Sequence, residues 1–214
     1  MTASAIGAGA VLLRLAGAYL DAPAMERAAW SFVFGTGALG WLGFFAALGG
    51  HLSPFELGAL CLVFVPGLFF LRGNASGFSP ESLDAWGWIL LAGIGLSVFG
   101  DLLEGLAPPA DADTLAYHFA IPKLFLSKGG IEFIPRAGDG AIPLLQQMTY
   151  MIVLGIGGEQ ATTLWTMLSG WGASALVFFV ARRHVGINWS MAVTLIFMTT
   201  PAVIYGAGSG HVEV

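Results

Sequence analysis

Charged residues are scarce in this chain: only 10% of its 214 residues are charged, whereas 57% are hydrophobic. A soluble domain carries about 25% charged residues, so this composition excludes an ordinary water-soluble globule. The chain also lacks the alternation of apolar and polar residues that is typical of membrane β-strands. It contains long unbroken apolar runs instead, and these predict an all-α fold, a polytopic transmembrane helical bundle.

Cysteine and positive charge are also in short supply. The single cysteine, Cys61, lies in an apolar run and cannot form a disulfide within the chain, so packing is its expected role. The formal net charge of −5 argues against nucleic acid as a partner, because nucleic acid requires a basic face. Glycine, by contrast, is abundant, with 31 residues, and it allows helices in lipid to approach closely.

Five apolar segments reach or approach the length of about 20 residues that a spanning helix needs. These predicted spans are residues 28–49, 55–71, 86–106, 159–181 and 187–206. A sixth segment, residues 3–20, carries Arg14 near its middle. We predict that it is a first spanning helix, because a signal peptide would need a basic n-region that it lacks.

One polar stretch, residues 107–141, separates two apolar blocks. Asp113 is predicted to cap a short helix over residues 114–121, and Gly129 to end a second helical turn that starts at Pro122. The apolar side chains of this stretch are expected to rest on the membrane surface, with the polar side toward water. These side chains are Leu115, Phe119, Leu124 and Phe125.

The predicted topology depends on the basic residues, which prefer the cytoplasmic side. A helix over residues 142–157 would be about 24 Å long, shorter than the hydrocarbon layer of about 30 Å. If this segment dips into the membrane or lies at its interface without crossing, residues 107–141 face outside and the arginines that flank the predicted spans face the cytoplasm. These arginines are Arg27, Arg72, Arg182 and Arg183.

Two acidic elements meet on the predicted external face. Asp111 and Asp113 are two residues apart in a loop, so their side chains point the same way, and Glu213 emerges on the same side. Oxygen ligands of this kind suit Mg²⁺ or Mn²⁺, and we predict a divalent metal site made by these three carboxylates. Lys123 and Arg136 are suited to neutralise a phosphate nearby.

Each of these residues also has a plain structural interpretation. The two aspartates can be a helix cap and its solvated neighbour. His118 is more often an interfacial hydrogen-bonding residue than a ligand, and Lys123 and Lys128 can anchor short helices at lipid headgroups. Asp101 and Glu104, three apart on one helix face, are either solvated charges at a helix end or an additional acidic wall.

The run ADADTLAYHFAIPKLFLSKGGIEFIP, residues 110–135, resembles the first external loop of the GT-C membrane glycosyltransferases. This superfamily includes protein O-mannosyltransferases, aminoarabinose transferases and oligosaccharyltransferases. Residues 179–214 also resemble theirs, in which a basic cytoplasmic turn leads into a helix, a Ser/Thr-Pro break and a second acidic external motif. The resemblance covers roughly residues 86–214, and residues 1–85 resemble accessory helices placed before this core.

This resemblance implies a transferase that uses a polyprenyl-phosphate-linked sugar at the outer face of a membrane, expected to be the bacterial inner membrane. In such enzymes an aspartate of the first external loop is the general base, or positions the acceptor or metal. By position this is Asp113 or Asp111, and Asp113 is favoured because it adjoins the short helix. Glu213 falls at the second acidic motif, and His118 and Lys123 are candidates for contacting the donor phosphate.

Members of this superfamily continue for several more helices, so the resemblance implies that the chain is an N-terminal portion, with a separate C-terminal half as an expected partner. The alternative is a non-enzymatic membrane protein, such as a transporter half or an assembly subunit. Charges in the middle of spans would favour transport, and only Arg14 qualifies. The acids clustered in one external loop favour the enzyme.

Overall fold

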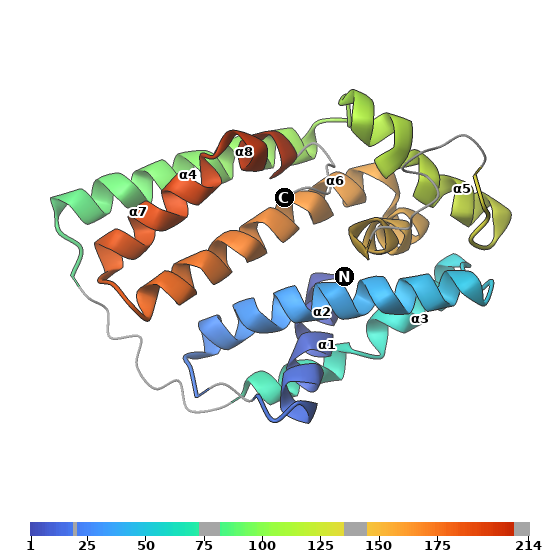
Figure 1. The fold of residues 1–214 in the computed structure, drawn as a ribbon, viewed down its shortest axis with the longest axis horizontal. Helices are drawn as coiled ribbons and strands as arrows, with labels where there is room; N and C mark the ends of the chain where they lie inside the picture. Colours follow the sequence, from blue (N-terminus) through green and yellow to red (C-terminus); the bar gives the residue numbers. More distant parts are fainter. Residues whose placement is uncertain (19–20, 73–81, 135–144, 208–214) are drawn as a thin grey trace.

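The computed structural model describes residues 1–18, 21–72, 82–134 and 145–207, and in this part of the chain it has helices and no strand. The helices in chain order are α1 (Thr2–Leu15), α2 (Ala24–Leu48), α3 (Pro54–Leu62), η1 (Val65–Leu71), α4 (Ala85–Leu106), η2 (Thr114–His118), α5 (Ala120–Lys128), α6 (Leu145–Arg182), α7 (Ile187–Met198) and α8 (Pro201–Ala207). The chain is therefore an all-α helical bundle, as predicted (Figure 1).

Four helical segments are long and apolar enough to cross a membrane: α2, α3 continued by η1, α4, and α6. The 22 residues of α4 give a length of about 33 Å, which exceeds the hydrocarbon thickness of about 30 Å. Most side chains of α4 are exposed and apolar, among them Trp88, Leu96 and Phe99, as lipid-facing side chains would be. The protein is a multi-pass membrane protein.

Two predicted spans differ from the structure in their extent. The segment predicted over residues 3–20 ends as a helix at Leu15, before the left-handed Gly17, and its 14 residues measure about 21 Å. Arg14 is therefore in its last turn, where the guanidinium lies 4.8 Å from the ring centroid of Phe70, and not in the middle of a span. The segment over residues 187–206 is divided into α7 and α8, because Pro201 cannot continue the hydrogen bonding of α7.

Helix α1 packs backbone to backbone between α2 and η1, and glycines make this approach possible. A Cβ on Gly9 would lie 1.8 Å from the carbonyl oxygen of Ser31, and a Cβ on Gly35 would lie 1.7 Å from that of Ala5. On the other side of α1, a Cβ on Gly7 would lie 2.0 Å from a carbonyl oxygen just before η1. Small residues at such contacts are the usual means of helix association in lipid.

Helix α6 is divided by a bend at Gly158, whose φ of 75° and ψ of −169° are open to glycine and strained for other residues. After the bend, residues 159–182 run along the bundle. Before it, residues 145–157 turn away and enter the core, where Figure 1 shows them nearly end-on. The predicted segment 142–157 thus forms a buried helix from Leu145 onward, and residues 142–144 lie outside the described part.

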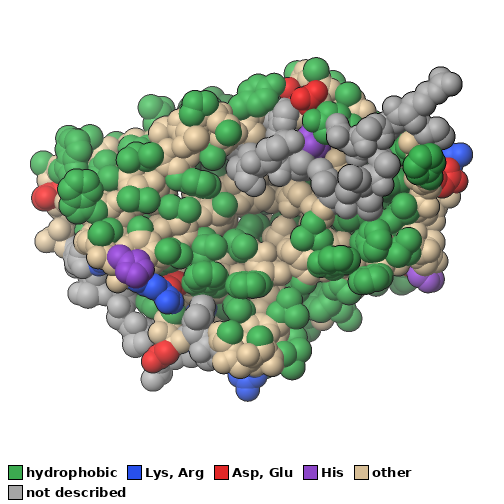
Figure 2. Space-filling model, in the orientation of Figure 1, with side chains coloured by type: hydrophobic (Ala, Val, Ile, Leu, Met, Phe, Trp, Pro, Cys, Tyr) green, Lys and Arg blue, Asp and Glu red, His purple; other side chains and the backbone are tan. Residues whose placement is uncertain are grey.

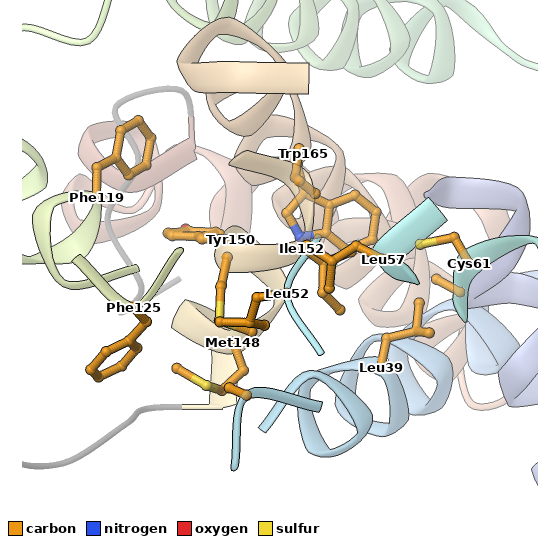
Figure 3. Packing of buried hydrophobic residues seen from close by; sticks show 14 of the residues in the cluster. Leu39, Leu52, Leu57, Cys61, Phe119, Phe125, Met148, Tyr150, Ile152 and Trp165 are labelled. Atoms are coloured by element: carbon orange, nitrogen blue, oxygen red, sulfur yellow. The ribbon is translucent and has the colours of Figure 1, made fainter. Parts of the chain in front are cut away.

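Residues 145–157 form the centre of the hydrophobic core. Figure 3 shows Met148, Tyr150 and Ile152 of this helix between two groups of neighbours, with Phe119 and Phe125 on one side and α2 and α3 on the other. Phe119 and Phe125 are 0% and 1% exposed. They were expected to rest on the membrane surface, but they fill the core against residues 145–157 instead.

One end of the bundle is closed by polar contacts between helix termini. Arg183 at the end of α6 forms an ion pair with Glu26 at the start of α2, with 2.5 Å between Arg183 Nη2 and Glu26 Oε1. Arg27 donates to the last carbonyl of η1 at 2.9 Å. Asn188 of α7 donates to Asp84, the N-cap of α4, at 2.9 Å. The four arginines that we predicted to share one side therefore lie at one end, which we call the basic end.

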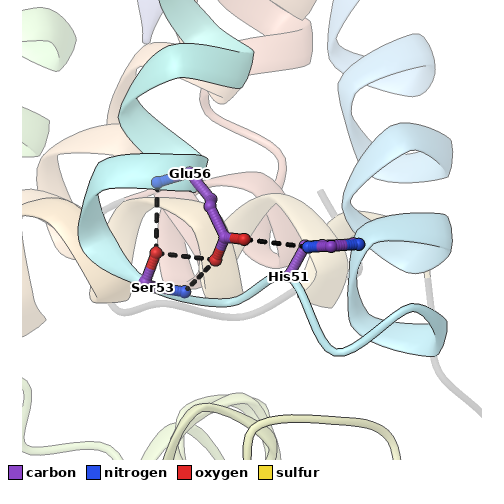
Figure 4. A network of polar contacts seen from close by, with 3 residues as sticks. All are labelled: His51, Ser53 and Glu56. Atoms are coloured by element: carbon purple, nitrogen blue, oxygen red, sulfur yellow. Dashed lines mark hydrogen bonds and ion pairs between the residues drawn. The ribbon is translucent and has the colours of Figure 1, made fainter.

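The opposite end carries the turns after α2, α4 and α5, and we call it the acidic end. Helix α3 begins at this end with a capping box (Figure 4): Glu56 N–H donates to Ser53 Oγ at 3.3 Å, and Ser53 N–H donates to Glu56 Oε2 at 3.0 Å. His51 Nδ1 lies 2.8 Å from the other oxygen of Glu56. These bonds satisfy the N–H groups that a helix start leaves open.

Formal charge is divided unequally between the two ends among the described residues. The basic end has five arginines against three acids, namely Arg14, Arg27, Arg72, Arg182 and Arg183 against Asp21, Glu26 and Asp84. The acidic end has seven acids against two lysines, namely Glu56, Asp101, Glu104, Asp111, Asp113, Glu132 and Glu159 against Lys123 and Lys128. Figure 2 shows the consequence on one face: apolar side chains cover its middle, and charged side chains lie along its edges.

The close contact between α1 and α2 predicts a strong effect of one methyl group. Replacement Gly35→Ala forces the two helices apart, because its Cβ meets backbone and not a flexible side chain, and we expect a loss of about 1–3 kcal/mol. Thermal unfolding in detergent, followed by circular dichroism, measures this loss. The matched control is Gly95→Ala in α4, where nothing lies within 4 Å of the added methyl group and stability should be unchanged or raised. Equal stability of both variants would contradict the packing described for α1.

Candidate functional site

The polar turn after α4 begins with a cap made by Asp111. Thr114 N–H donates to Asp111 Oδ2 at 2.8 Å, so the helical turn starts directly after this residue. Asp113, which we predicted as the cap, makes no cap hydrogen bond and is exposed, and that prediction was wrong. The following residues form a π-helical turn, η2, in which Phe119 N–H donates to Thr114 O at 2.9 Å. π-Helical turns are rare in proteins, and those that occur often lie at functional sites.

Helix α8 brings a tyrosine to this turn. The hydroxyl of Tyr205 donates to Asp111 Oδ1, so both oxygens of Asp111 hold elements that are far apart in the sequence. The hydrogen bond to Asp111 raises the pKa of Tyr205, and partial desolvation and the negative charges of Asp111, Asp113 and Glu104 raise it further. Three acids therefore gather around one phenol at the acidic end.

The underside of the turn is fixed to the buried part of α6. His118 is 0% exposed, and its Nδ1 lies 3.3 Å from Nε2 of the equally buried Gln147. The next residue, Phe119, packs edge-to-face on Tyr150, with ring centroids 5.7 Å apart. His118 thus makes a buried contact with Gln147, whereas the alternative interpretation placed its hydrogen bond at the membrane interface, and its contact with a donor phosphate stays a prediction.

The polar stretch is attached to α6 at two places, both just after the bend of α6. The carbonyl of Gly105, at the end of α4, accepts from Gln160 Nε2 at 2.7 Å and from Thr163 Oγ1 at 2.8 Å. Further along, Lys123 of α5 forms an ion pair with Glu159. The first two contacts satisfy the carbonyl of Gly105, which the end of α4 leaves without a helical partner. Together with the ion pair they hold against α6 the turn that carries Asp111 and Asp113, which we call the acidic turn.

Asp101 and Glu104 have different surroundings although both lie on α4. Asp101 accepts a hydrogen bond of 3.0 Å from Trp171 Nε1 and so faces α6. Glu104 is exposed and lies close enough to Tyr205 to act on its ionisation. Of the two interpretations given for this pair, Glu104 fits the acidic wall, whereas Asp101 fits neither.

The predicted site residues fall into two groups. Asp111, Asp113, His118 and Lys123 all lie at the acidic end, the first two beside Tyr205 and the last two against α6. Arg136 and Glu213 lie outside the described residues. Within the described ranges no three potential metal ligands gather, and Asp111 is already bonded to Thr114 and Tyr205. The described residues therefore do not complete a metal site, and the three-carboxylate site stays a prediction.

Three contributors to this region were missed in the sequence. Gln147 had a signal, because it is a polar residue in an apolar run that folds into the core. Tyr205 and Glu159 had none, because their partners are 94 and 36 residues away.

No family model, curated protein or solved structure matches this chain. The resemblance to GT-C glycosyltransferases therefore stays a prediction.

The bond between Tyr205 and Asp111 predicts an unusual titration. The folded protein holds the phenolic proton more tightly than the unfolded chain does, so the contact stabilises α8 at neutral pH and is lost as the pH rises above the ordinary tyrosine value of about 10. When the pH is raised, the phenolate absorbance of the native protein should increase in a step above the ordinary tyrosine pKa, and this step should be missing in Tyr205→Phe. In Asp111→Asn the step should move to lower pH, toward the ordinary tyrosine pKa. A step at unchanged pH in either variant would contradict the contact between Tyr205 and Asp111.

Proposed function

We propose that this protein is a GT-C-type membrane glycosyltransferase, or the N-terminal portion of one, which transfers a sugar from a polyprenyl-phosphate-linked donor to an acceptor hydroxyl at the acidic end. One observation carries the proposal: Asp111 accepts hydrogen bonds from Thr114 N–H of its own turn and from Tyr205 of the distant helix α8, and the exposed Asp113 stands beside it. A rigid carboxylate next to an accessible one, at the edge of an apolar bundle, suits chemistry on a lipid-linked polar substrate.

Asp113 is the general base in this proposal. Its carboxylate takes the proton of the acceptor hydroxyl while the hydroxyl oxygen bonds to the anomeric carbon of the sugar. The bond between that carbon and the phosphate oxygen breaks, and polyprenyl phosphate leaves with the electron pair. Asp111 is a positioning residue, because it fixes the turn that carries Asp113 through Thr114 and Tyr205.

The leaving phosphate needs positive charge near it. Lys123 is the candidate on the described part of the turn, and its ion pair with Glu159 is partly exposed, with side-chain exposures of 41% and 46%. A pair that exposed is weak, so a phosphate can compete with Glu159 for the ammonium group. Arg136 is the second candidate for this role.

The membrane orientation in this proposal follows the charges. The membrane is the bacterial inner membrane. The basic end, with its excess of arginine, faces the cytoplasm, and the acidic end, with residues 107–134, faces outward. The donor's polar head then meets the turn at the interface while its tail stays in lipid.

Replacement Asp113→Asn tests the chemistry. We expect the transfer of radiolabelled sugar from polyprenyl-phosphate donors to fall by about 100-fold or more, because the amide cannot take the proton. The assay uses membranes from source cells that carry the variant at the native locus. The control is Glu132→Gln, an exposed acid of the same end that pairs with Lys128, and it should transfer sugar normally. Unchanged transfer in Asp113→Asn would exclude the proposed base.

Single cysteines test the orientation. In a Cys61→Ala background, cysteines are placed at the exposed positions Ala112 and His184 of the acidic and basic ends. A membrane-impermeant thiol reagent added to intact spheroplasts should label position 112 and leave position 184 unlabelled until the membrane is opened. The opposite pattern, or labelling of both positions, would exclude the orientation.

A further inference from the structure

Two buried side chains at the π-helical turn each carry an oxygen that no protein group bonds. Thr114 of η2 and Gln147 of α6 are both 0% exposed. Among the described residues, neither Thr114 Oγ1 nor Gln147 Oε1 has a hydrogen-bond partner. The large majority of buried side-chain polar atoms in proteins bond to protein or to ordered water. A pair of such oxygens therefore indicates a further partner.

The two side chains belong to facing surfaces. His118 follows Thr114 by four residues, a spacing that places side chains on one face of a helical turn. Gln147 touches this face, because its Nε2 lies 3.3 Å from His118 Nδ1. The next residue, Phe119, packs on Tyr150, which follows Gln147 by three residues in the buried helix (Figure 3). Thr114 therefore lies one turn along the face that the Gln147 amide contacts.

The hydroxyl is the only polar group of Thr114 that the protein leaves unbonded. Its N–H donates to Asp111 Oδ2, and its carbonyl accepts from Phe119 N–H. Other buried hydroxyls of the bundle donate to a carbonyl one turn earlier in their own helix, as Thr166 does at 3.0 Å. Thr114 makes no such bond, because Ala110, four residues earlier, precedes the helical residues.

The amide of Gln147 has a partner on one side only. Its Nε2 faces His118, and its Oε1 has no partner in the described part of the chain. Exchange of the amide oxygen and nitrogen does not remove this deficit, since amide N–H groups would then replace the oxygen as the unbonded atoms. A buried polar group left unbonded would cost free energy in either orientation.

We propose that one water molecule binds between Thr114 Oγ1 and Gln147 Oε1. The water donates one hydrogen to Gln147 Oε1, which can only accept, and accepts the hydroxyl hydrogen of Thr114. Two such bonds are within the range of about 2–4 that buried water makes in proteins. Both side chains are uncharged and fully buried, so the site selects a small neutral molecule that can both donate and accept.

This water connects the acidic turn to the buried part of α6. It bonds the residue whose N–H caps Asp111, and it joins that residue to the helix at the centre of the core. The site does not include the exposed Asp113 and does not depend on the proposed transferase activity.

A crystal structure of the full chain, grown in a lipid mesophase at a resolution that shows ordered water, tests the site directly. We expect a density peak for one oxygen atom at about 2.7–3.2 Å from both Thr114 Oγ1 and Gln147 Oε1. No peak between them, or a direct hydrogen bond between the two side chains, would overturn the proposal.

Thermal unfolding in detergent gives a test with a predicted sign. Thr114→Val removes the hydroxyl at nearly constant volume. Loss of a bond to water should lower the melting temperature by about 2–4 °C, whereas removal of an unbonded buried hydroxyl should raise it. The matched control is Thr194→Val, a buried threonine whose Oγ1 donates to Ser190 O within α7, and its melting temperature should change by less than about 1 °C. A raised melting temperature in Thr114→Val would overturn the bound water.

A double variant shows whether the two oxygens share one water. Gln147→Met removes the amide, and its lost contact with His118 cancels when the single and double variants are compared. If the water is shared, the melting temperature of Thr114→Val/Gln147→Met should fall by less than the sum of the two single falls, because either substitution alone removes the water. Additive falls would mean that the two oxygens have separate partners, and the bridge would be overturned.

Discussion

The bend at Gly158 is the constraint on which the rest of the structure depends. Its backbone conformation is open to glycine alone, and it turns residues 145–157 into the centre of the bundle. From there Met148 packs against Gly43 of α2, Gln147 contacts His118, and Tyr150 supports Phe119. One short helix thereby connects the N-terminal helices to the acidic turn, so residues before and after residue 85 share a single core.

Polar groups inside an apolar bundle must find partners within it, and this requirement explains how the acidic turn is held. Trp165 Nε1 donates to Thr149 at 2.8 Å, and Thr166 donates to Tyr150 at 3.1 Å, which closes the buried helix against the rest of α6. At the acidic end, Asp111 and the carbonyl of Gly105 also have hydrogen-bond partners within the bundle. The exposed Asp113 differs from them, and in the proposed mechanism this difference separates the reactive group from the groups that support it.

Charge gives the molecule two unlike ends. Acidic side chains surround the turn proposed to act on a sugar donor, whereas arginines close the opposite end through Glu26 and the last carbonyl of η1. Helix α1 packs closely against both α2 and η1, and these two helices also meet at the basic end, where Arg27 donates to the last carbonyl of η1.

The sequence by itself determined the helical class, most of the spans, the polar stretch and the turn that ends at Gly129, because hydropathy, proline and glycine act over short distances. It also indicated that the arginines share one side. Only the tertiary structure decided that Asp111 and not Asp113 is the cap, that Phe119 and Phe125 are buried, and that Tyr205 meets Asp111. The burial of the two phenylalanines and the contact of Tyr205 depend on residues that are distant in the chain, and the pattern of a single segment does not contain them. The cap is a local contact, but either aspartate has a side chain suited to it. The bend at Gly158 was hidden for a related reason: one glycine among 31 carries no local mark of the backbone conformation that its neighbours in space require.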